Sequence, residues 1–285
     1  MKSTKKIISI DKLHAFENHP YKVQDNEEME ALAESIKEHG IVSPAIVRPL
    51  ENTSDEYEII SGHRRVMASR KAGITEVPAL IVSLDRDAAA IVLVDSNLHR
   101  EHILPSEKAY AYKMKLDAMK HQGWRSDLTS NQLGGKLETA DLVGAETGDS
   151  KNQVRRYIRL TNLIPEILQY VDDGRISFTP AVELSYLNEQ EQQDLLEQIE
   201  QSDCTPSLSQ ACRFKKISQG EGLTPEVIAE IMEEEKANQK EMFKMPMEDI
   251  RKFIPKGNEQ KTKDFVVKAC EHYHKYLRQR NRDER

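Results

Sequence analysis

The chain has 285 residues, of which 38% are hydrophobic and 31% are charged, and its formal net charge is −7. A chain of this length and composition can bury a sizeable core, which excludes disorder throughout and predicts about two globular domains. It contains neither a run of about 18 apolar residues nor a signal-like start, so we expect a cytoplasmic protein. The three cysteines show no C-x-x-C spacing, which argues against a disulfide framework and a zinc site.

The first third of the sequence alternates strand and helix patterns. Helical spacing of apolar residues ends at Gly40 in one segment and at Gly73 in another, where glycine is a common helix stop. The predicted helices cover 26–39, 63–72 and 88–98, and the predicted strands cover 7–10, 45–50, 57–60 and 77–82. The middle two strands are separated by a turn-rich segment, which allows a hairpin. These residues predict a compact α/β unit of about a hundred residues.

From Pro105 onward the pattern is helical, with the short connections of a helical bundle. Helices are predicted over 106–122, 130–137, 140–147, 151–162, 165–172, 180–187, 189–201 and 207–218. Residues 218–222 form the clearest linker, and 233–245 is polar enough to be a solvated helix or a flexible stretch. A small C-terminal unit is expected after it, in which Val266, Ala269, Tyr273 and Leu277 form one helical stripe. This stripe is either a dimer seam or the core of a small domain.

Residues 140–162 have the features of a helix-turn-helix. Gly148 suits the turn because it tolerates a left-handed backbone, and Gly144 leaves room for the two helices to approach closely. Ser150 is placed to cap the second helix, which leaves the positive end of that helix free to face a phosphate. Asp149 departs from this pattern, since an apolar residue commonly occupies that turn position.

The second of these helices is strongly basic, although the chain as a whole is acidic. Four cations and no acid lie between Ser150 and Leu160, whereas twelve acids face three cations between Glu189 and Glu235. Burial of Val154, Ile158 and Tyr157 turns the polar residues of this helix toward solvent. The DNA-binding residues predicted here are Ser150, Lys151, Gln153, Arg155, Arg156 and Arg159. The alternative is that these cations only solvate the surface of a bundle.

A glycine turn followed by two arginines lies earlier in the chain, at the end of a predicted strand. Glycine lets backbone N–H groups approach a phosphate, a helix N-terminus adds partial positive charge, and arginine side chains can donate paired hydrogen bonds. The residues are Gly62, His63, Arg64 and Arg65. Taken alone, such a motif is as consistent with solvated arginines at a helix start as with an anion site.

A second polar cluster ends the predicted helix at 88–98. It supplies an amide, a cation and a carboxylate in Asn97, Arg100 and Glu101. If this cluster and the Gly62–Arg65 segment meet in space, a nucleoside triphosphate could bind between them, with Asn97 coordinating a hydrated Mg²⁺. The alternative is that Arg100 and Glu101 form a surface ion pair of little consequence.

These motifs occur in an order that resembles the ParB partition-protein family over about residues 7–220. The matching segments are Asn18-His-Pro-Tyr-Lys22, Ile59-Ile-Ser-Gly-His-Arg-Arg65, Ser96-Asn-Leu-His-Arg-Glu101 with Pro105-Ser-Glu-Lys-Ala-Tyr110, and Val154-Arg-Arg-Tyr-Ile-Arg-Leu160. The resemblance implies an α+β ParB/sulfiredoxin-like N-terminal domain at 1–104 and an all-α helix-turn-helix domain at 105–219. A linker and a small helical region for dimerisation are implied at 220–285.

The resemblance also implies a function. It predicts a dimer that binds CTP and Mg²⁺, recognises a palindromic centromere-like DNA site, closes into a clamp and works with a ParA-type ATPase, without contacting a membrane. Slow CTP hydrolysis is implied only by this likeness. We expect the protein to associate with the nucleoid or with a plasmid.

The sequence departs from the family pattern at several positions. His63 and Ser96 stand where the family usually has glutamates, Lys22 stands near a usual arginine, and Asp95 lies one residue out of register with a missing carboxylate. These changes affect the expected CTP specificity and hydrolysis more than DNA binding. They resemble plasmid or mobile-element members of the family.

Two other functions fit the same residues. A ParB-fold enzyme, either a phosphotransferase or a nuclease, could use His63, His99 and Glu101 as acid, base or metal ligands. A transcription regulator could use the same helix-turn-helix to bind promoters. Rapid turnover of a nucleotide or of DNA would favour the enzyme, and regulated promoters beside the binding sites would favour the regulator.

Overall fold

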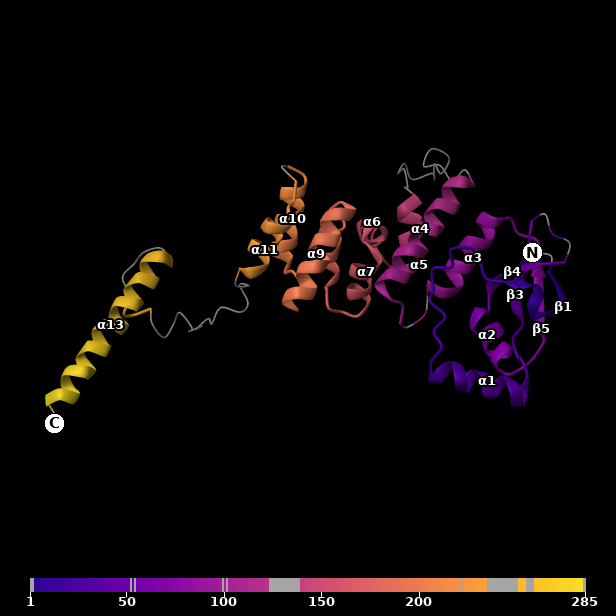
Figure 1. Ribbon diagram of the computed structural model, residues 1–285, viewed down its shortest axis with the longest axis horizontal. Coiled ribbons are helices and arrows are strands. Elements are labelled where there is room, and N and C mark those ends of the chain that lie inside the picture. Colours follow the sequence, from indigo (N-terminus) through magenta and orange to yellow (C-terminus); the bar gives the residue numbers. More distant parts are fainter. Residues whose placement is uncertain are drawn as a thin grey trace. The chain divides into compact units, whose positions relative to one another are not determined.

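A computed structural model of the chain describes residues 3–51, 53, 55–98, 100, 102–122, 139–220, 222–234, 251–254 and 259–283. The chain divides into two compact units, Met1–Glu234 and Glu235–Arg285. Figure 1 shows the order of the elements along both units. No helix among the described residues has both the length and the apolar character needed to cross a bilayer.

A mixed sheet forms the first part of the larger unit. Its strands are β1 (Ser3–Ser9), β2 (Leu13–His14), β3 (Ala45–Pro49), β4 (Tyr57–Ser61) and β5 (Glu76–Val82). They lie in the order β1-β5-β3-β4-β2, with β1/β5 and β3/β4 antiparallel and β5/β3 and β4/β2 parallel. The predicted hairpin of β3 and β4 is confirmed. The edge strand β1 begins earlier than predicted, because its exposed lysines pair with β5 through the backbone alone.

Helices cover both faces of this sheet. The helices of the region are α1 (Glu27–His39), α2 (His63–Lys71) and α3 (Arg86–Leu98), and a 3-10 turn covers Ile10–Lys12. Val66 of α2 packs with Val47 and Ile59 on one face, whereas Leu93 of α3 packs with Ile60 on the other. Because side chains alternate between the two faces along a strand, consecutive residues of β4 pack into two different cores. Asn26 caps α1 by accepting a hydrogen bond from the backbone N–H of Met29 at 3.1 Å.

The remaining elements of the larger unit are helices. They are α4 (Pro105–His121), α5 (Thr139–Thr147), α6 (Lys151–Arg159), a 3-10 turn (Leu160–Asn162), α7 (Pro165–Asp172), α8 (Phe178–Leu184), α9 (Glu189–Ser202), α10 (Leu208–Ser218) and α11 (Pro225–Glu233). Helix α4 contacts α3 on one side and α5, α6 and α7 on the other (Figure 1). It therefore joins the sheet region to the helical region. The helix predicted at 130–137 lies outside the described residues.

The structure corrects the interpretation of residues 218–222 as a linker. The chain makes a tight turn there, in which the carbonyl of Ile217 accepts hydrogen bonds from the N–H groups of Gly220 and Gly222. After this turn Leu223 is buried, and Ile228 and Ile231 of α11 belong to the same core as α7–α10. Polar composition suggested a linker, but apolar residues just beyond it return the chain to the core. The predicted boundary at 219/220 stays a prediction.

The smaller unit contains α13 (Glu259–Asp283), which includes the predicted C-terminal stripe. Tyr273 is 62% exposed within the single chain, and Val266 and Leu277 are half-buried. Dimerisation through this helix stays a prediction. The polar stretch at 233–245 lies almost entirely outside the described residues.

Candidate functional site

The two polar clusters of the first third meet at one cavity. This cavity of about 540 Å³ lies where β4 ends, between the start of α2 and the end of α3. Six of the seven predicted nucleotide-binding residues line it, namely Gly62, His63, Arg64, Arg65, Asn97 and Arg100. Glu101, the seventh, lies outside the described residues. The two basic segments therefore lie on the same side of the domain.

Gly62 forms the start of α2 in a conformation that favours glycine. Its φ angle is +105°, and a Cβ atom there would lie 3.3 Å from the backbone of Ala45 and 3.2 Å from the Arg65 guanidinium. No side chain caps the first N–H groups of α2. This uncapped end borders the cavity and can donate hydrogen bonds to an anion there.

The arginines around the cavity have different partners. Arg64 donates to Glu28 at 3.0 Å in an exposed ion pair, which a phosphate could replace. Arg65 instead donates to the backbone carbonyls of Ser43 and Pro44, so it also holds the loop before β3 in place. The guanidinium of Arg100 lies 5.4 Å from the centre of the Tyr21 ring.

His63 occupies the position where the resemblance predicts a carboxylate. Its Nε2 accepts a hydrogen bond from the backbone N–H of Phe16 at 3.4 Å, and its ring lies 3.9 Å from that of His19. Burial lowers the pKa of His63 to about 3, and the charges of His19 and Arg100 act in the same direction. The residue is therefore neutral near pH 7.

Coordination of Mg²⁺ by Asn97 and phosphate oxygens stays a prediction, since a metal held mainly by the ligand needs few protein groups. The described residues contain no group of three or more histidine, cysteine, aspartate or glutamate side chains able to hold a metal. The Asn97 amide donates to the Leu93 carbonyl at 2.7 Å and to Ser96 Oγ at 3.2 Å. Asp95, which lies one residue out of register with the family's carboxylate, pairs with buried Lys115, since one residue along a helix rotates a side chain by about 100°.

Among the cavity residues that were not predicted as ligands are four with ring or charged side chains: His19, Tyr21, Lys22 and Glu28. They come from the segment between β2 and α1 and from α1 itself. The segment Asn18–Lys22 carried part of the family resemblance, but it has no glycine-arginine pattern that indicates an anion site. Only the pairing of the strands brings this segment to the end of β4.

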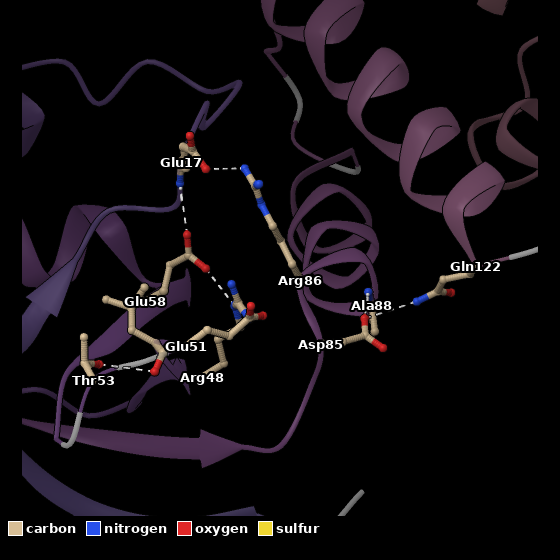
Figure 2. A network of polar contacts seen from close by, with 10 residues as sticks. Glu17, Arg48, Glu51, Thr53, Glu58, Asp85, Arg86, Ala88 and Gln122 are labelled. Atoms are coloured by element: carbon tan, nitrogen blue, oxygen red, sulfur yellow. Dashed lines mark hydrogen bonds and ion pairs between the residues drawn. The ribbon is translucent and has the colours of Figure 1, made fainter.

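A network of polar contacts around Glu17 and Glu58 holds the segment just before His19 (Figure 2). Glu58 on β4 accepts a hydrogen bond from the backbone N–H of Glu17 at 3.1 Å and from Arg48 Nε at 2.7 Å. The Arg48 and Glu58 side chains are only 4% and 6% exposed. The Glu17 carboxylate in turn pairs with Arg86 of α3. The backbone next to the cavity is thus attached both to the sheet and to α3.

The helix-turn-helix has the predicted local geometry. Gly148 has a φ angle of +74°, and Ser150 caps α6 by accepting a hydrogen bond from the Gln153 N–H at 3.2 Å. An added Cβ on Gly144 would lie 2.2 Å from the carbonyl oxygen of Asp149. This confirms that Gly144 is needed where the two helices of the motif approach each other closely. Val154 is fully buried.

The unusual Asp149 has specific partners in the structure. Its carboxylate accepts hydrogen bonds from Lys108 Nζ at 2.7 Å and from the Tyr112 hydroxyl, both on α4. Burial acts to raise the pKa of Asp149, but these two hydrogen bonds outweigh it, so the pKa lies below its ordinary value. Asp149 therefore attaches the turn to α4 in place of an apolar contact.

The cations of α6 are not uniformly directed toward solvent, which corrects the expectation for two of them. Arg159 lies 3.8 Å from the centre of the Tyr186 ring and donates to the Ser185 carbonyl at 3.2 Å. Arg156 lies 4.9 Å from the Phe178 ring and donates to Thr179 at 3.0 Å. Aromatic residues near α8 attract these guanidinium groups, a contact that helical spacing cannot reveal.

The other DNA-binding candidates differ in their exposure. Arg155 is exposed, whereas Lys151 and Gln153 are half-buried and Ser150 forms the exposed N-cap. The first turn of α6 contains no acidic residue. A cationic helix start therefore remains accessible at the predicted position.

Comparison with known proteins identifies both parts of the larger unit. Residues 1–98 match the ParB N-terminal domain, and residues 101–207 match the ParB HTH domain. A nucleoid occlusion protein of Listeria innocua is 31% identical over 196 residues, which are 68% of this chain and 62% of the relative. A probable chromosome 1-partitioning protein ParB of Deinococcus radiodurans is 35% identical over 175 residues, 61% of this chain and 53% of the relative. The chain thus spans about half to three fifths of the length of these relatives.

Two solved structures of a C-terminally truncated ParB from Caulobacter crescentus are also similar. One, in complex with CTP-gamma-S, is 26% identical, with 69% and 98% of the two chains covered and a TM-score of 0.33. The other, in complex with the centromeric parS site, is 23% identical, with 74% and 98% covered and a TM-score of 0.42. The curated relatives above are named for chromosomal roles, so a plasmid or mobile-element origin stays a prediction. From the two matched domains, which follow each other along the sequence, the chain belongs to the ParB family.

Proposed function

We propose that this chain is a sequence-specific DNA-binding partition protein whose N-terminal cavity binds CTP. The observation that carries the proposal is the meeting of Gly62–Arg65 with Asn97 and Arg100 at one cavity, in the same unit as a helix-turn-helix. The named relatives include a chromosome-partitioning ParB, and one similar structure is a complex with a CTP analogue. The protein would act on nucleoid or plasmid DNA.

The electrostatics of the cavity support a highly charged anion. Four cations line it, Lys22, Arg64, Arg65 and Arg100, against the single carboxylate of Glu28 among its described residues. Phosphate oxygens accept paired hydrogen bonds from guanidinium groups, and the uncapped start of α2 adds further donors. A triphosphate therefore matches this lining better than a neutral ligand does.

The helical region supports binding to double-stranded DNA. Helix α6 begins at a serine cap, carries Lys151 and Arg155 near its start, and is held against α4 by Val154 and Asp149. Such a helix can enter the major groove with its N-terminal residues at the base edges. A palindromic site would require two copies of α6, and the proposed assembly is therefore a homodimer. Closure of this dimer as a clamp and a ParA-type ATPase partner are proposed from the family likeness.

Contacts between the cavity and the helical region could couple nucleotide binding to the placement of the DNA-binding helices. Lys22 lines the cavity, and its Nζ pairs with Asp172 of α7 at 3.1 Å while its backbone N–H donates to Glu107 of α4 at 2.8 Å. Asp172 also accepts a hydrogen bond from the Ser106 N–H at 2.9 Å. A phosphate that attracts Lys22 would weaken its contact with α7. Nucleotide binding and the placement of the DNA-binding helices would then be linked.

The nucleotide part of the proposal is tested by CTP binding to the purified full chain. We expect Arg64→Ala to abolish binding, whereas Arg70→Ala, an exposed cation on the same helix outside the cavity, leaves it unchanged. Equal binding by the wild type and Arg64→Ala would contradict the site. Binding of ATP or GTP as tightly as CTP would contradict the base specificity only.

The DNA part is tested by recovering bound DNA from cells, with and without the Arg64 and Arg156 changes. Arg156→Ala should weaken site binding, and Arg64→Ala should leave initial site recognition intact. Selective recovery of promoters whose transcription depends on the protein would favour the regulator. No selective recovery at near-physiological salt would contradict sequence-specific binding.

The structure gives little support to an enzyme that uses His63. Its Nε2 accepts the Phe16 N–H, and burial lowers the pKa of His63 to about 3. A general base works best with a pKa near the operating pH, so this ring is poorly suited to proton abstraction. Fast nucleotide or DNA turnover that is lost in His63→Ala would contradict this conclusion.

A further inference from the structure

Two histidines from different parts of the chain lie against each other at the wall of the cavity. The rings of His19 and His63 lie 3.9 Å apart between centroids, at an interplanar angle of 47°. His19 comes from the segment between β2 and α1, and His63 is the first residue of α2. Both line the cavity together with Arg64 and Arg100. A bound polyphosphate would therefore lie close to both rings.

The hydrogen bonds of the two rings fix different nitrogens. A backbone N–H can only donate, so His63 Nε2 is the acceptor of the Phe16 N–H and its Nδ1 carries the proton. A backbone carbonyl can only accept, so His19 Nδ1 donates to the Tyr21 carbonyl at 2.7 Å. In the neutral pair, His19 Nε2 is therefore the basic nitrogen that is not engaged by the backbone.

Protonation has a different cost at the two rings. A proton on His63 Nε2 would break the hydrogen bond from Phe16 and place two N–H groups against each other. A proton on His19 Nε2 leaves the hydrogen bond to Tyr21 in place and strengthens it, because a charged donor is stronger. The geometry therefore selects His19 as the ring that can become a cation.

Burial, together with the nearby charge of Arg100, lowers the pKa of His19 in the free protein. Arg100 and burial oppose its protonation, whereas Glu107 of α4 and the Tyr21 carbonyl favour it, with burial the largest effect and a lowered pKa of His19 as the result. Lys22 and Asp172 share a neighbouring cavity with His19. Arg64, Arg65 and Glu28 face it from across the main cavity. Beyond the effect of burial, Arg100 opposes a positive charge on His19, and an incoming anion would offset that opposition.

We propose that His19 is a phosphate-binding residue of this cavity and that it takes up one proton from solvent as a nucleotide polyphosphate binds. The new N–H forms at Nε2 and donates to a phosphate oxygen, so the ligand gains a further cation where no described carboxylate group forms a metal centre. The attachment of Glu17 to Glu58 keeps this segment in place (Figure 2). The inference rests on the proposed nucleotide site.

The test is calorimetric titration of CTP into the full chain without added metal, in buffers of equal pH and different ionisation enthalpy. The dependence of the observed heat on that enthalpy counts the protons taken up. We expect the wild type to take up about one proton more than His19→Gln when CTP binds. The CTP affinity of the wild type should therefore fall more steeply with rising pH than that of His19→Gln, by up to about tenfold per pH unit. His39→Gln, an exposed histidine outside the cavity, should match the wild type.

The outcomes separate this inference from the proposed function. CTP binding with the same proton count in the wild type and His19→Gln overturns the role of His19 but leaves the nucleotide site standing. Absence of CTP binding by the wild type overturns the site itself. Because His19→Gln also removes the ring contact with His63, the His19 ring is followed in the wild type as well by NMR titration. Its pKa should rise when CTP is added, and an unchanged pKa overturns the inference without any variant.

Discussion

Replacement of Gly144 with alanine tests the packing of the helix-turn-helix. The added Cβ would lie 2.2 Å from the carbonyl oxygen of Asp149, about 1 Å closer than atoms of this kind normally approach. Because that atom belongs to the backbone, the turn between α5 and α6 must open. The opening also weakens the hydrogen bond from the Asp149 N–H to the Gly144 carbonyl, which is 3.1 Å long.

The size of the effect follows from three contributions. Overpacking costs about 1–3 kcal/mol, and loss of the hydrogen bond costs about 1 kcal/mol. The better helix propensity of alanine offsets about 1 kcal/mol. We therefore expect the free energy of unfolding to fall by about 1–3 kcal/mol, measured by urea denaturation, and DNA affinity to fall as α6 shifts.

Gly148→Ala is the matched control for this prediction. Nothing lies within 4 Å of a Cβ added to Gly148, so its cost comes only from the φ angle of +74° and amounts to about 1–2 kcal/mol. Gly148→Ala should lower stability while the folded protein retains its DNA affinity. If Gly144→Ala instead has wild-type stability and DNA affinity, the close approach of the two helices is not what fixes α6.

Three further predictions concern single side chains. Arg155→Ala should weaken DNA binding and reduce the slope of log K against log salt by about one, whereas Arg213→Ala, an exposed cation on α10, should change neither. The pKa of Asp149 is lowered in the folded state, so the stability that its carboxylate contributes is present above the unfolded pKa and is lost as pH falls through the folded pKa. The stability difference between the wild type and Asp149→Asn should therefore shrink in acid. A difference that stays constant with pH would contradict a stabilising role of the ionised carboxylate. Glu58→Ala should cost about 3–5 kcal/mol in urea denaturation because buried Arg48 keeps only its ion pair with exposed Glu51, and a cost below about 1 kcal/mol would show that Glu51 is a sufficient partner.

The local features of the site were determined by neighbouring residues in the sequence. Gly148 and Ser150 adopt the predicted turn and cap, because backbone conformation and capping depend on a few consecutive residues. The start of α2 at Gly62 also depends on a few consecutive residues. Helical periodicity likewise placed Val154 in the core. The fold class followed from the order of such segments.

Tertiary structure decided what surrounds these local features. His19 reaches the cavity only because β2 pairs with β4 and the following segment passes the start of α2. Arg159 lies against Tyr186, and Asp149 against Lys108, across distances in sequence that no local pattern records. Side-chain partners of this kind depend on which faces of distant elements meet. The sequence by itself thus determined where the basic segments begin, and only the packing decided which charges face a ligand.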